Sequence, residues 1–349
     1  MGAVRSASHH VHMNIRRCLP ADRAGVIAAL RASFDGWHGD LSETYWKWKF
    51  ERNPHGQAHI WVGDDEGTVA GCYVWNPVRL RIGGTRVLGA QSVDAAVHPD
   101  YQGRGLFTDL ARAATEDAGD LELVYAFPTE AAFRGQLRVG FGSASQILNT
   151  YRPLHPGFLR RPRSGALEIR ETSAFDERFD ALAATRASWG IEVDRDAAYL
   201  NWRYVAHPVQ RYETLTCERS GELLGYCTLT ADTTRGRLVR GYVIDLQVLP
   251  GEDGAAELLV RHALQRLRQR GARVAIAWLR PPGLERDAFE RHGFSRRYEA
   301  LRGILGAPRR LNELIVYEPN ASRIAELTTS QGAPSPPSWC LVPGDADYT

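Results

Sequence analysis

A glycine-spaced loop in this chain reads Val97-His98-Pro99-Asp100-Tyr101-Gln102-Gly103-Arg104-Gly105-Leu106-Phe107. The residues from Val93 to Val97 are typical of a strand, and apolar residues recur at helical spacing from Leu106 to Ala114. Glycines at such a turn let the backbone approach a ligand closely, and the first amides of the helix have no partner within it. Because these N–H groups and the helix dipole favour an anion, the loop predicts a pyrophosphate site.

This segment resembles motif A of the GCN5-related N-acetyltransferase (GNAT) superfamily, whose loop follows the pattern Arg/Gln-Gly-x-Gly/Ala. Gln102-Gly103-Arg104-Gly105 fills that pattern, and Val97-His98-Pro99 supplies the Val-x-Pro that usually precedes it. An ordinary glycine-rich turn is the alternative, since such turns are common. A Rossmann loop fits less well, because the third glycine of Gly-x-Gly-x-x-Gly is absent.

The resemblance implies that the chain binds acetyl-CoA or another acyl-CoA as a co-substrate. The pyrophosphate would lie on the loop, and the pantetheine arm would lie along the strand that ends at Val97. The residues that the resemblance places at coenzyme A are Ala96, Val97, His98, Gln102, Gly103, Arg104, Gly105, Leu106 and Phe107.

Length and composition indicate a soluble protein of two domains. The chain has 349 residues, a hydrophobic content of 44% and a charged content of 24%. Its net charge of +2 indicates neither a nucleic-acid nor a membrane partner. The five scattered cysteines favour a reducing cytoplasm over a disulfide framework, and we expect no metal site. Residues 1–12 lack the apolar stretch of a signal peptide and are interpreted as a disordered tail.

An internal repeat divides the chain. Tyr45–Pro54 (YWKWKFERNP) reappears 154 positions later as Tyr199–Pro208 (YLNWRYVAHP). Further blocks match in the same order, and this agreement predicts two copies of one fold. These blocks are Gly67 and Gly71 with Gly221 and Gly225, Val93–Pro99 with Ile244–Pro250, and Gly140-Phe141 with Gly293-Phe294.

Each copy is predicted to be an α/β (α+β) domain with a mixed, mostly antiparallel sheet flanked by helices. The expected domains are residues 13–155, with the coenzyme A site, and residues 167–349, joined by a linker at 156–166. A Pro-rich loop at 331–338 precedes a final strand at Trp339–Val342. In the first copy we expect helices at 22–32, 106–117 and 130–138, and strands at 60–62, 69–75, 87–97 and 121–127.

The second copy lacks the coenzyme A signature. Pro250 is followed by Gly251, Glu252, Asp253 and Gly254, so two carboxylates would lie beside any pyrophosphate. Because like charges repel strongly where water is excluded, this copy is predicted to have lost coenzyme A. It would instead wall the acceptor cleft, support the first domain or mediate dimerisation.

The chemistry that the resemblance implies is direct acyl transfer from a thioester to an amine. A strand amide near Ala96 and Val97 would polarise the thioester carbonyl. Relatives often carry a glutamate base where this chain has Gln91, which leaves Asp94 as the nearest carboxylate and the candidate catalytic base. The matching Asp245 of the second copy favours a structural hydrogen-bond acceptor instead.

Other candidates for proton transfer stay open. His98 could titrate near neutral pH, and Asp345 and Asp347 could reach the cleft if the C-terminal segment folds back. Many relatives place a tyrosine acid four residues before the Gly-Phe pair, where this chain has Gln136 and, in the second copy, Phe289. Tyr101 and Tyr125 are nearby hydroxyls, and the thiolate could also leave toward water.

The repeated aromatic block has two interpretations. Trp46 and Trp48 alternate with Lys47 and Lys49, which could build the aromatic wall of an acceptor site. The reappearance of the block around Trp202 favours packing in a core or between the domains.

The sequence thus predicts a cytoplasmic N-acetyltransferase that acetylates the primary amine of a small molecule, such as an amino sugar or a biosynthetic intermediate. One alternative is a long-chain acyl-CoA N-acyltransferase that modifies a glycosylated natural product. Another is a non-catalytic coenzyme A-binding scaffold. The expected assembly is a monomer or a homodimer.

Overall fold

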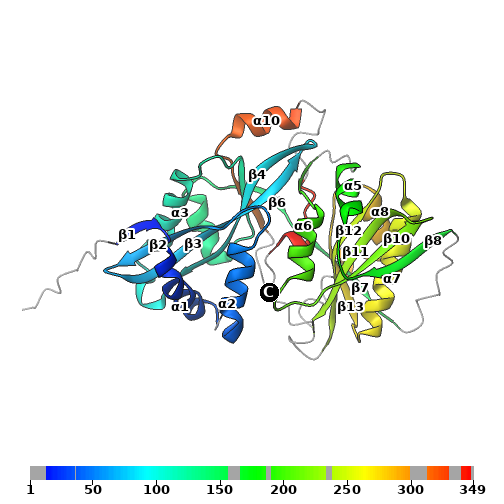
Figure 1. Cartoon of the computed structure of the whole chain (residues 1–349), viewed down its shortest axis with the longest axis horizontal. Coiled ribbons are helices and arrows are strands. Elements are labelled where there is room, and N and C mark those ends of the chain that lie inside the picture. The colour runs from blue at the N-terminus through cyan, green and yellow to red at the C-terminus, as the bar shows by residue number, and fades with distance from the viewer. Residues whose placement is uncertain are drawn as a thin grey trace, which may run out of the picture.

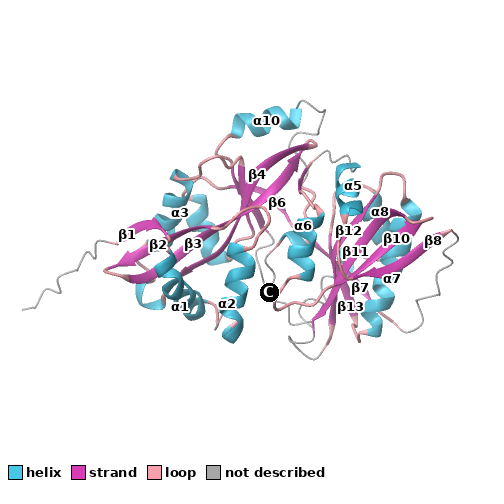
Figure 2. Cartoon of the chain, in the orientation of Figure 1, coloured by secondary structure: helices cyan, strands magenta, loops and turns pink. Residues whose placement is uncertain are grey.

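Two mixed sheets flanked by helices form two lobes that lie side by side (Figures 1 and 2). The computed structural model describes residues 13–35, 37–155, 166–185, 190–232, 238–298, 313–329 and 339–346. Most neighbouring strands pair antiparallel, and each lobe has one parallel pair at its centre. The predicted fold class, with two tandem domains, is therefore confirmed.

The first sheet contains the strands that precede and follow the predicted coenzyme A loop. Its order is β1-β2-β3-β4-β5-β14-β6, and β9 pairs with the far end of β3. Its helices include α1 (Arg23–Ser33), α2 (Ser42–Trp46), α3 (Leu106–Glu116) and α4 (Glu130–Leu137). The strands are β1 (Asn14–Arg17), β2 (His59–Asp65), β3 (Thr68–Ile82), β4 (Thr85–Val97), β5 (Leu123–Ala126), β6 (Gly142–Gln146), β9 (Ile191–Val193) and β14 (Glu313–Tyr317).

The second sheet has the order β7-β13-β12-β11-β10-β8. Helix α7 (Asp253–Gln269) supplies much of its core, because one face of the helix packs Ala and Leu side chains against β10, β11 and β12. The strands are β7 (Asn149–Pro153), β8 (Leu167–Thr172), β10 (Glu213–Arg219), β11 (Glu222–Asp232), β12 (Arg240–Val248) and β13 (Val274–Trp278). Further α-helices of the described residues are α5 (Glu177–Thr185), α6 (Ala197–Leu200) and α8 (Leu284–Arg291), whereas α10 (Ala321–Thr329) contacts β3 of the first sheet.

Three of the described strands pair with the sheet of the other copy, because β9 of the second copy pairs with β3 and two further strands also cross. β7 follows β6 after two residues but pairs with β13 of the second sheet, and β14 inserts between β5 and β6 of the first sheet. Strand pairing therefore does not follow the continuous ranges 13–155 and 167–349. Residues 1–12, most of the predicted linker at 156–166 and the Pro-rich loop at 331–338 lie outside the described residues.

The expected helices and strands of the first copy occur where predicted, within a few residues, although β3 continues to Ile82. The final strand predicted at Trp339–Val342 is wrong. Only Trp339 makes a bridge, to Ile191, and the chain then turns through Pro343–Asp345 between the two lobes. Pro343 cannot donate a ladder hydrogen bond, which disfavours continuing the strand. All five cysteines are free.

The repeated aromatic block forms the contact between the lobes. Both copies of the block contain a π-helical turn, η3 (Lys47–Glu51) and η5 (Asn201–Val205), offset by the repeat length. Trp48 and Trp202 stack with ring centroids 4.9 Å apart. Tyr199 stacks on His55, and Tyr45 lies edge-on to His207. The interpretation of the block as interdomain packing is therefore the one that the contacts support.

Candidate functional site

The loop between β4 and α3 presents a row of free amides. Gly103 and Gly105 have φ values of +76° and +85°, which favour glycine, and beyond the adjacent residues the only atom of a described residue within 4 Å of a Cβ built at either is Asp109 Oδ2, 3.9 Å from that of Gly105. Among the described residues, none accepts a hydrogen bond from the amides of residues 103–107. Residues 102–105 are exposed and lead directly into an 11-residue helix that begins at the buried Leu106. The arrangement fits a pyrophosphate.

Side chains of the loop hold its shape rather than block it. Gln102 donates its amide to the Val97 carbonyl at 3.0 Å, and Arg104 donates to the Asp100 carbonyl at 2.9 Å. The Tyr101 hydroxyl donates to Asp65 at 2.7 Å, and this bond raises the pKa of Tyr101. His98 accepts the Asp100 amide through Nδ1. His98 and Tyr101 therefore have local structural partners.

Strands β4 and β5 separate beyond Ser92 and Ala126, on the side toward the loop that precedes α3. Their parallel pairing runs from Gly89 and Leu123 to Ser92 and Ala126, whereas β4 continues to Val97. On the other side of β4 the register with β3 shifts, so that Asp94 and Ala95 both lie opposite Tyr73. This β-bulge increases the local twist and bends β4. The unpaired edge of β4 from Val93 to Val97 is a place where an amide-bearing arm can lie.

A buried polar cluster lies where the two strands part. Gln136 of α4 donates Nε2 to the Tyr73 hydroxyl at 2.8 Å and to the Ser92 hydroxyl at 3.2 Å. Its Oε1 is buried and accepts no hydrogen bond from a described residue. Burial also raises the pKa of Tyr73. The sequence drew attention to Gln136 alone; Tyr73 and Ser92 carry no motif, and only the register of β3 and β4 brings them to it.

Asp94, the predicted base, lies at the bulge and faces the α1–α2 side of the sheet. Its Oδ1 accepts from the Trp37 indole at 3.2 Å, and its Oδ2 pairs with the Lys49 ammonium. Asp245, its match in the second copy, accepts hydrogen bonds from Arg195, Tyr204 and Tyr226.

The other predicted carboxylates and hydroxyls lie between the lobes or outside the described residues. Tyr125 is buried and donates to the Asp345 carbonyl at 3.2 Å. Asp345 is buried and pairs with Arg195 at 2.5 Å. Desolvation outweighs the attraction of Arg195 and raises the pKa of Asp345 to about 6. Asp347 lies outside the described residues.

The loop between β12 and α7, which in the second copy corresponds to the β4–α3 loop, contains different residues. Glu252 caps α7 and forms a two-pronged salt bridge with Arg219, at 2.8 and 2.7 Å. A carboxylate therefore lies where the first copy exposes free amides.

The separated strands of the second copy hold a segment of the same chain. β12 and β13 pair only from Arg240 to Tyr242, and the space beyond is lined by Ile244, Trp278 and Phe289 together with Val342 and Pro343. Arg203 donates to the carbonyls of Gly344 and Ala346 at 2.8 and 2.9 Å. Leu341, Val342 and Ala346 are buried. We call residues 339–346 the C-terminal segment.

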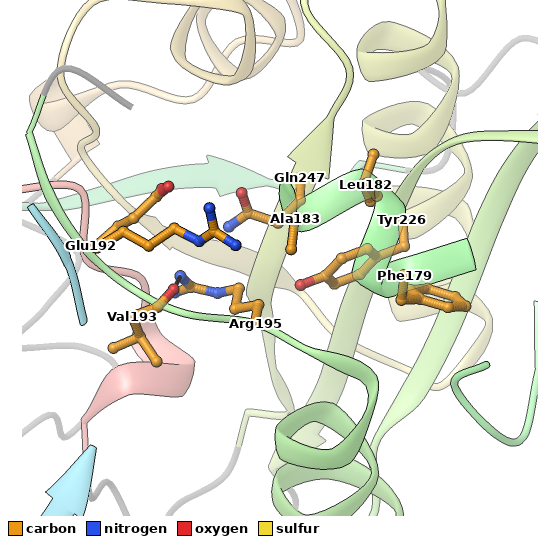
Figure 3. A pocket seen from close by; sticks show the side chains of 9 residues that line it. Phe179, Leu182, Ala183, Glu192, Val193, Arg195, Tyr226 and Gln247 are labelled. Carbon is orange, nitrogen blue, oxygen red and sulfur yellow. Dashed lines mark hydrogen bonds between the residues drawn. The ribbon is translucent and has the colours of Figure 1, made fainter. Parts of the chain in front are cut away.

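A cavity at the lobe interface is held by ion pairs (Figure 3). It is lined by Phe179 and Leu182 of α5, and by Arg81, Arg195 and Gln247 among the polar side chains. Arg81 pairs with Asp194, and Arg195 pairs with Asp245 and Asp345. No residue of the β4–α3 loop lines this cavity, and its two arginines are engaged, so its lining is explained by interface stability.

Comparisons with known proteins agree with this geometry. Residues 14–143 match the family model described as acetyltransferase (GNAT) domain. A GCN5-related N-acetyltransferase from Anabaena variabilis has a similar fold, with a TM-score of 0.64 and 17% identity over 88% of this chain and 73% of that one. Eis1 from Mycobacterium abscessus gives a TM-score of 0.57 and 20% identity over 89% and 74%.

A more distant similarity is to N-myristoyltransferase from Saccharomyces cerevisiae, solved with bound myristoyl-CoA. Its TM-score is 0.53 at 11% identity, over 87% of this chain and 82% of that one. No curated protein matches the sequence significantly. Within the described part of the chain, no helix is long and apolar enough to cross a bilayer, and no three potential metal ligands cluster.

Proposed function

We propose that this chain, whose residues 14–143 match the acetyltransferase (GNAT) domain model, transfers an acetyl group from acetyl-CoA to the primary amine of a small molecule. An amino sugar or a biosynthetic intermediate is the proposed acceptor. The observation that carries the proposal is the row of amides at residues 103–107, from which no described residue accepts a hydrogen bond. Unpartnered N–H groups at the start of a helix, together with the helix dipole, suit a pyrophosphate better than a neutral group.

Coenzyme A is proposed to contact Ala96, Val97, His98, Gln102, Gly103, Arg104, Gly105, Leu106 and Phe107. The amides from Gly103 to Phe107 would hold the pyrophosphate, and the exposed Arg104 guanidinium would add a positive charge. The free edge of β4 at Val93–Val97 offers amide and carbonyl groups to the pantetheine arm. When bound, acetyl-CoA supplies the thioester whose acyl carbon the amine attacks.

An amide of β4 near Ala96 and Val97 is proposed to polarise the thioester carbonyl. The bulge at Asp94 and Ala95 supports this role, because it turns the backbone just before these residues. Backbone donors held by a sheet need no reorganisation during the reaction.

Ser92 is proposed to hydrogen-bond the sulfur of the leaving thiolate. It is the last β4 residue paired with β5, so its hydroxyl lies where the strands part. Gln136 donates one amide hydrogen to Ser92 and one to Tyr73, and the Ser92 and Tyr73 hydroxyls also bond each other, so the Ser92 hydroxyl is held in place. A thiol has a pKa of about 8.5, so a hydrogen bond is enough help near neutral pH.

A small acceptor is supported by the packing around β5. Phe127, just after β5, contacts Trp278 with ring centroids 5.3 Å apart, and Tyr125 contacts both Trp339 and the Asp345 carbonyl. Side chains of the second lobe and of the C-terminal segment therefore lie beside β5, where they would limit the size of an acceptor that reaches the separated strands.

The second domain is proposed not to bind coenzyme A. The Glu252–Arg219 salt bridge at its loop and the C-terminal segment between its separated strands support this assignment. Its proposed role is to support the first domain and wall the acceptor side. A cytoplasmic monomer or homodimer is proposed, and the five free cysteines support the reducing location.

The test is thiol release from acetyl-CoA across a panel of amines that includes amino sugars, repeated with long-chain acyl-CoA. Turnover of acetyl-CoA with a small amine is expected. Preference for long-chain acyl-CoA would favour the acyltransferase of a glycosylated natural product. Thermal stabilisation by coenzyme A without turnover of any donor would favour a non-catalytic scaffold.

A further inference from the structure

Asp94 adopts a backbone conformation that is unusual within a strand. Its φ is +43°, and the other non-glycine residues of positive φ in the described ranges lie in turns. A side chain with a Cβ is strained in this left-handed region, although aspartate tolerates it better than most residues. Such a conformation persists only where the surrounding structure holds it in place.

Two segments hold the Asp94 side chain. Trp37, from the loop between α1 and α2, donates its indole N–H to Oδ1, and Lys49, from η3, pairs with Oδ2. The Lys49 and Asp94 side chains are only 4% and 10% exposed. Lys49 also lies over the rings of Tyr45 and Phe50, at 5.4 and 5.7 Å. The pair is therefore shielded from solvent and well packed.

The anchored residue is the one that bends β4. Asp94 and Ala95 together oppose Tyr73, and pairing with β5 has ended two residues earlier at Ser92. The residues that follow, Ala96 and Val97, belong to the β4 edge proposed to receive the coenzyme A arm. The bonds to Asp94 from the α1–α2 side therefore act on the backbone of β4 directly before Ala96 and Val97.

We propose that Asp94 is a positioning residue: its bonds to Lys49 and Trp37 hold the β4 bulge in the shape that binds coenzyme A. This inference rests on the proposed function and assigns Asp94 a role other than base. Each carboxylate oxygen faces a donor on the α1–α2 side, an orientation that suits an anchor.

The second copy is built differently at this point. Asp245 pairs opposite Thr228, and the additional residue of its bulge is Ile244. Neither residue has a positive φ. The anchored left-handed bulge therefore belongs to the copy that carries the free amides.

The test measures coenzyme A affinity by calorimetry and thermal stability without ligand for Asp94→Asn, Lys49→Met and the double variant. Each single variant is expected to weaken coenzyme A binding about tenfold or more, which corresponds to about 1.4 kcal/mol. The double variant should bind no more weakly than the single ones, because removing both partners leaves no unpaired buried charge. Asp94→Gly, which adopts positive φ without strain, guards against misfolding and should also bind weakly.

Asp194→Asn is the matched control, because it breaks another buried ion pair, Asp194–Arg81, in the lobe interface. It should lower the melting temperature without changing coenzyme A affinity. Wild-type affinity in folded Asp94→Asn and Lys49→Met would overturn the positioning role. Failure of the wild-type chain to bind coenzyme A would instead overturn the proposed function itself.

Discussion

Trp48 and Trp202 exchange hydrogen bonds across the lobe interface. The Trp48 indole donates to the Trp202 carbonyl at 2.8 Å, and the Trp202 indole donates to the Trp48 carbonyl at 2.7 Å. The two residues occupy the same position of the sequence repeat, 154 residues apart. A reciprocal contact between equivalent residues is what a two-fold axis produces in a dimer, so the two copies pack with local pseudo-two-fold symmetry.

This contact predicts a large and coupled loss of stability. Trp48→Ala should destabilise the chain by about 3–5 kcal/mol, because it removes a buried indole and leaves the Trp202 carbonyl unpaired. In the Trp48→Ala/Trp202→Ala double variant the losses should be less than additive, with a coupling of about 0.5–3 kcal/mol. Denaturant unfolding of the four proteins measures the cycle. Strict additivity would show that the two indoles stabilise the interface independently.

The free amides at the α3 loop predict that Gly103→Glu abolishes the thermal stabilisation by coenzyme A. The new carboxylate would repel the pyrophosphate, and glutamate is also strained at a φ of +76°. Gly103→Ala separates the two effects, because it keeps the strain, about 1 kcal/mol, without the charge. Asp253→Ala, in the second copy, should leave the stabilisation unchanged. Equal sensitivity at both loops would contradict a single coenzyme A site.

The buried amide of Gln136 predicts a split between binding and turnover. Gln136→Met has nearly the same volume, and the Tyr73 and Ser92 hydroxyls keep their bond to each other, so stability should change by less than about 1.5 kcal/mol. Coenzyme A affinity should stay the same, whereas kcat should fall about tenfold because the Ser92 hydroxyl then donates to Tyr73 instead of the leaving thiolate. Calorimetry and thiol-release kinetics check the two values. An unchanged kcat would remove the polar cluster from the mechanism.

The C-terminal segment leaves no room for a side chain at Gly344. A Cβ there would overlap the Tyr204 hydroxyl, so Gly344→Ala should destabilise the chain by about 1–3 kcal/mol. Tyr204→Phe in the same background should restore part of the loss by removing the overlapping atom. A melting-temperature cycle over the four proteins tests this. If Tyr204→Phe adds its own full cost instead, the segment does not pack as described.

Burial of Asp345 predicts a pH-dependent stability. Its pKa is raised to about 6 in the folded chain and returns to an ordinary aspartate value on unfolding. Between pH 4 and 6 the folded chain therefore binds the proton that the unfolded chain has released, and stability falls as pH rises. The integrated loss is roughly 3 kcal/mol relative to Asp345→Asn, which cannot titrate there. Urea unfolding of both proteins across this pH range measures the difference. The same pH dependence of stability in both would contradict the raised pKa of Asp345.

Local pattern was sufficient to predict the glycine loop that begins α3 and the tandem fold. The loop is contiguous, and the glycines at 103 and 105 are required by backbone conformation, so sequence spacing alone carries the information. The same holds for the helices at 23–33, 106–116 and 130–137, whose apolar periodicity is local. The repeat was visible because both copies keep several of the same residues, in the same order and at nearly the same separations.

What the tertiary structure alone decided are the contacts between distant strands. Three features depend on strand register, which a slip of one residue would change entirely. They are the pairing of β7 and β14 with the sheet of the other copy, the contact of Gln136 with Ser92 and Tyr73, and the position of the C-terminal segment. Asp94 illustrates the difference most sharply. Its type and position suggested a base, whereas its partners, Lys49 and Trp37, are 45 and 57 residues away and are brought to it only by folding.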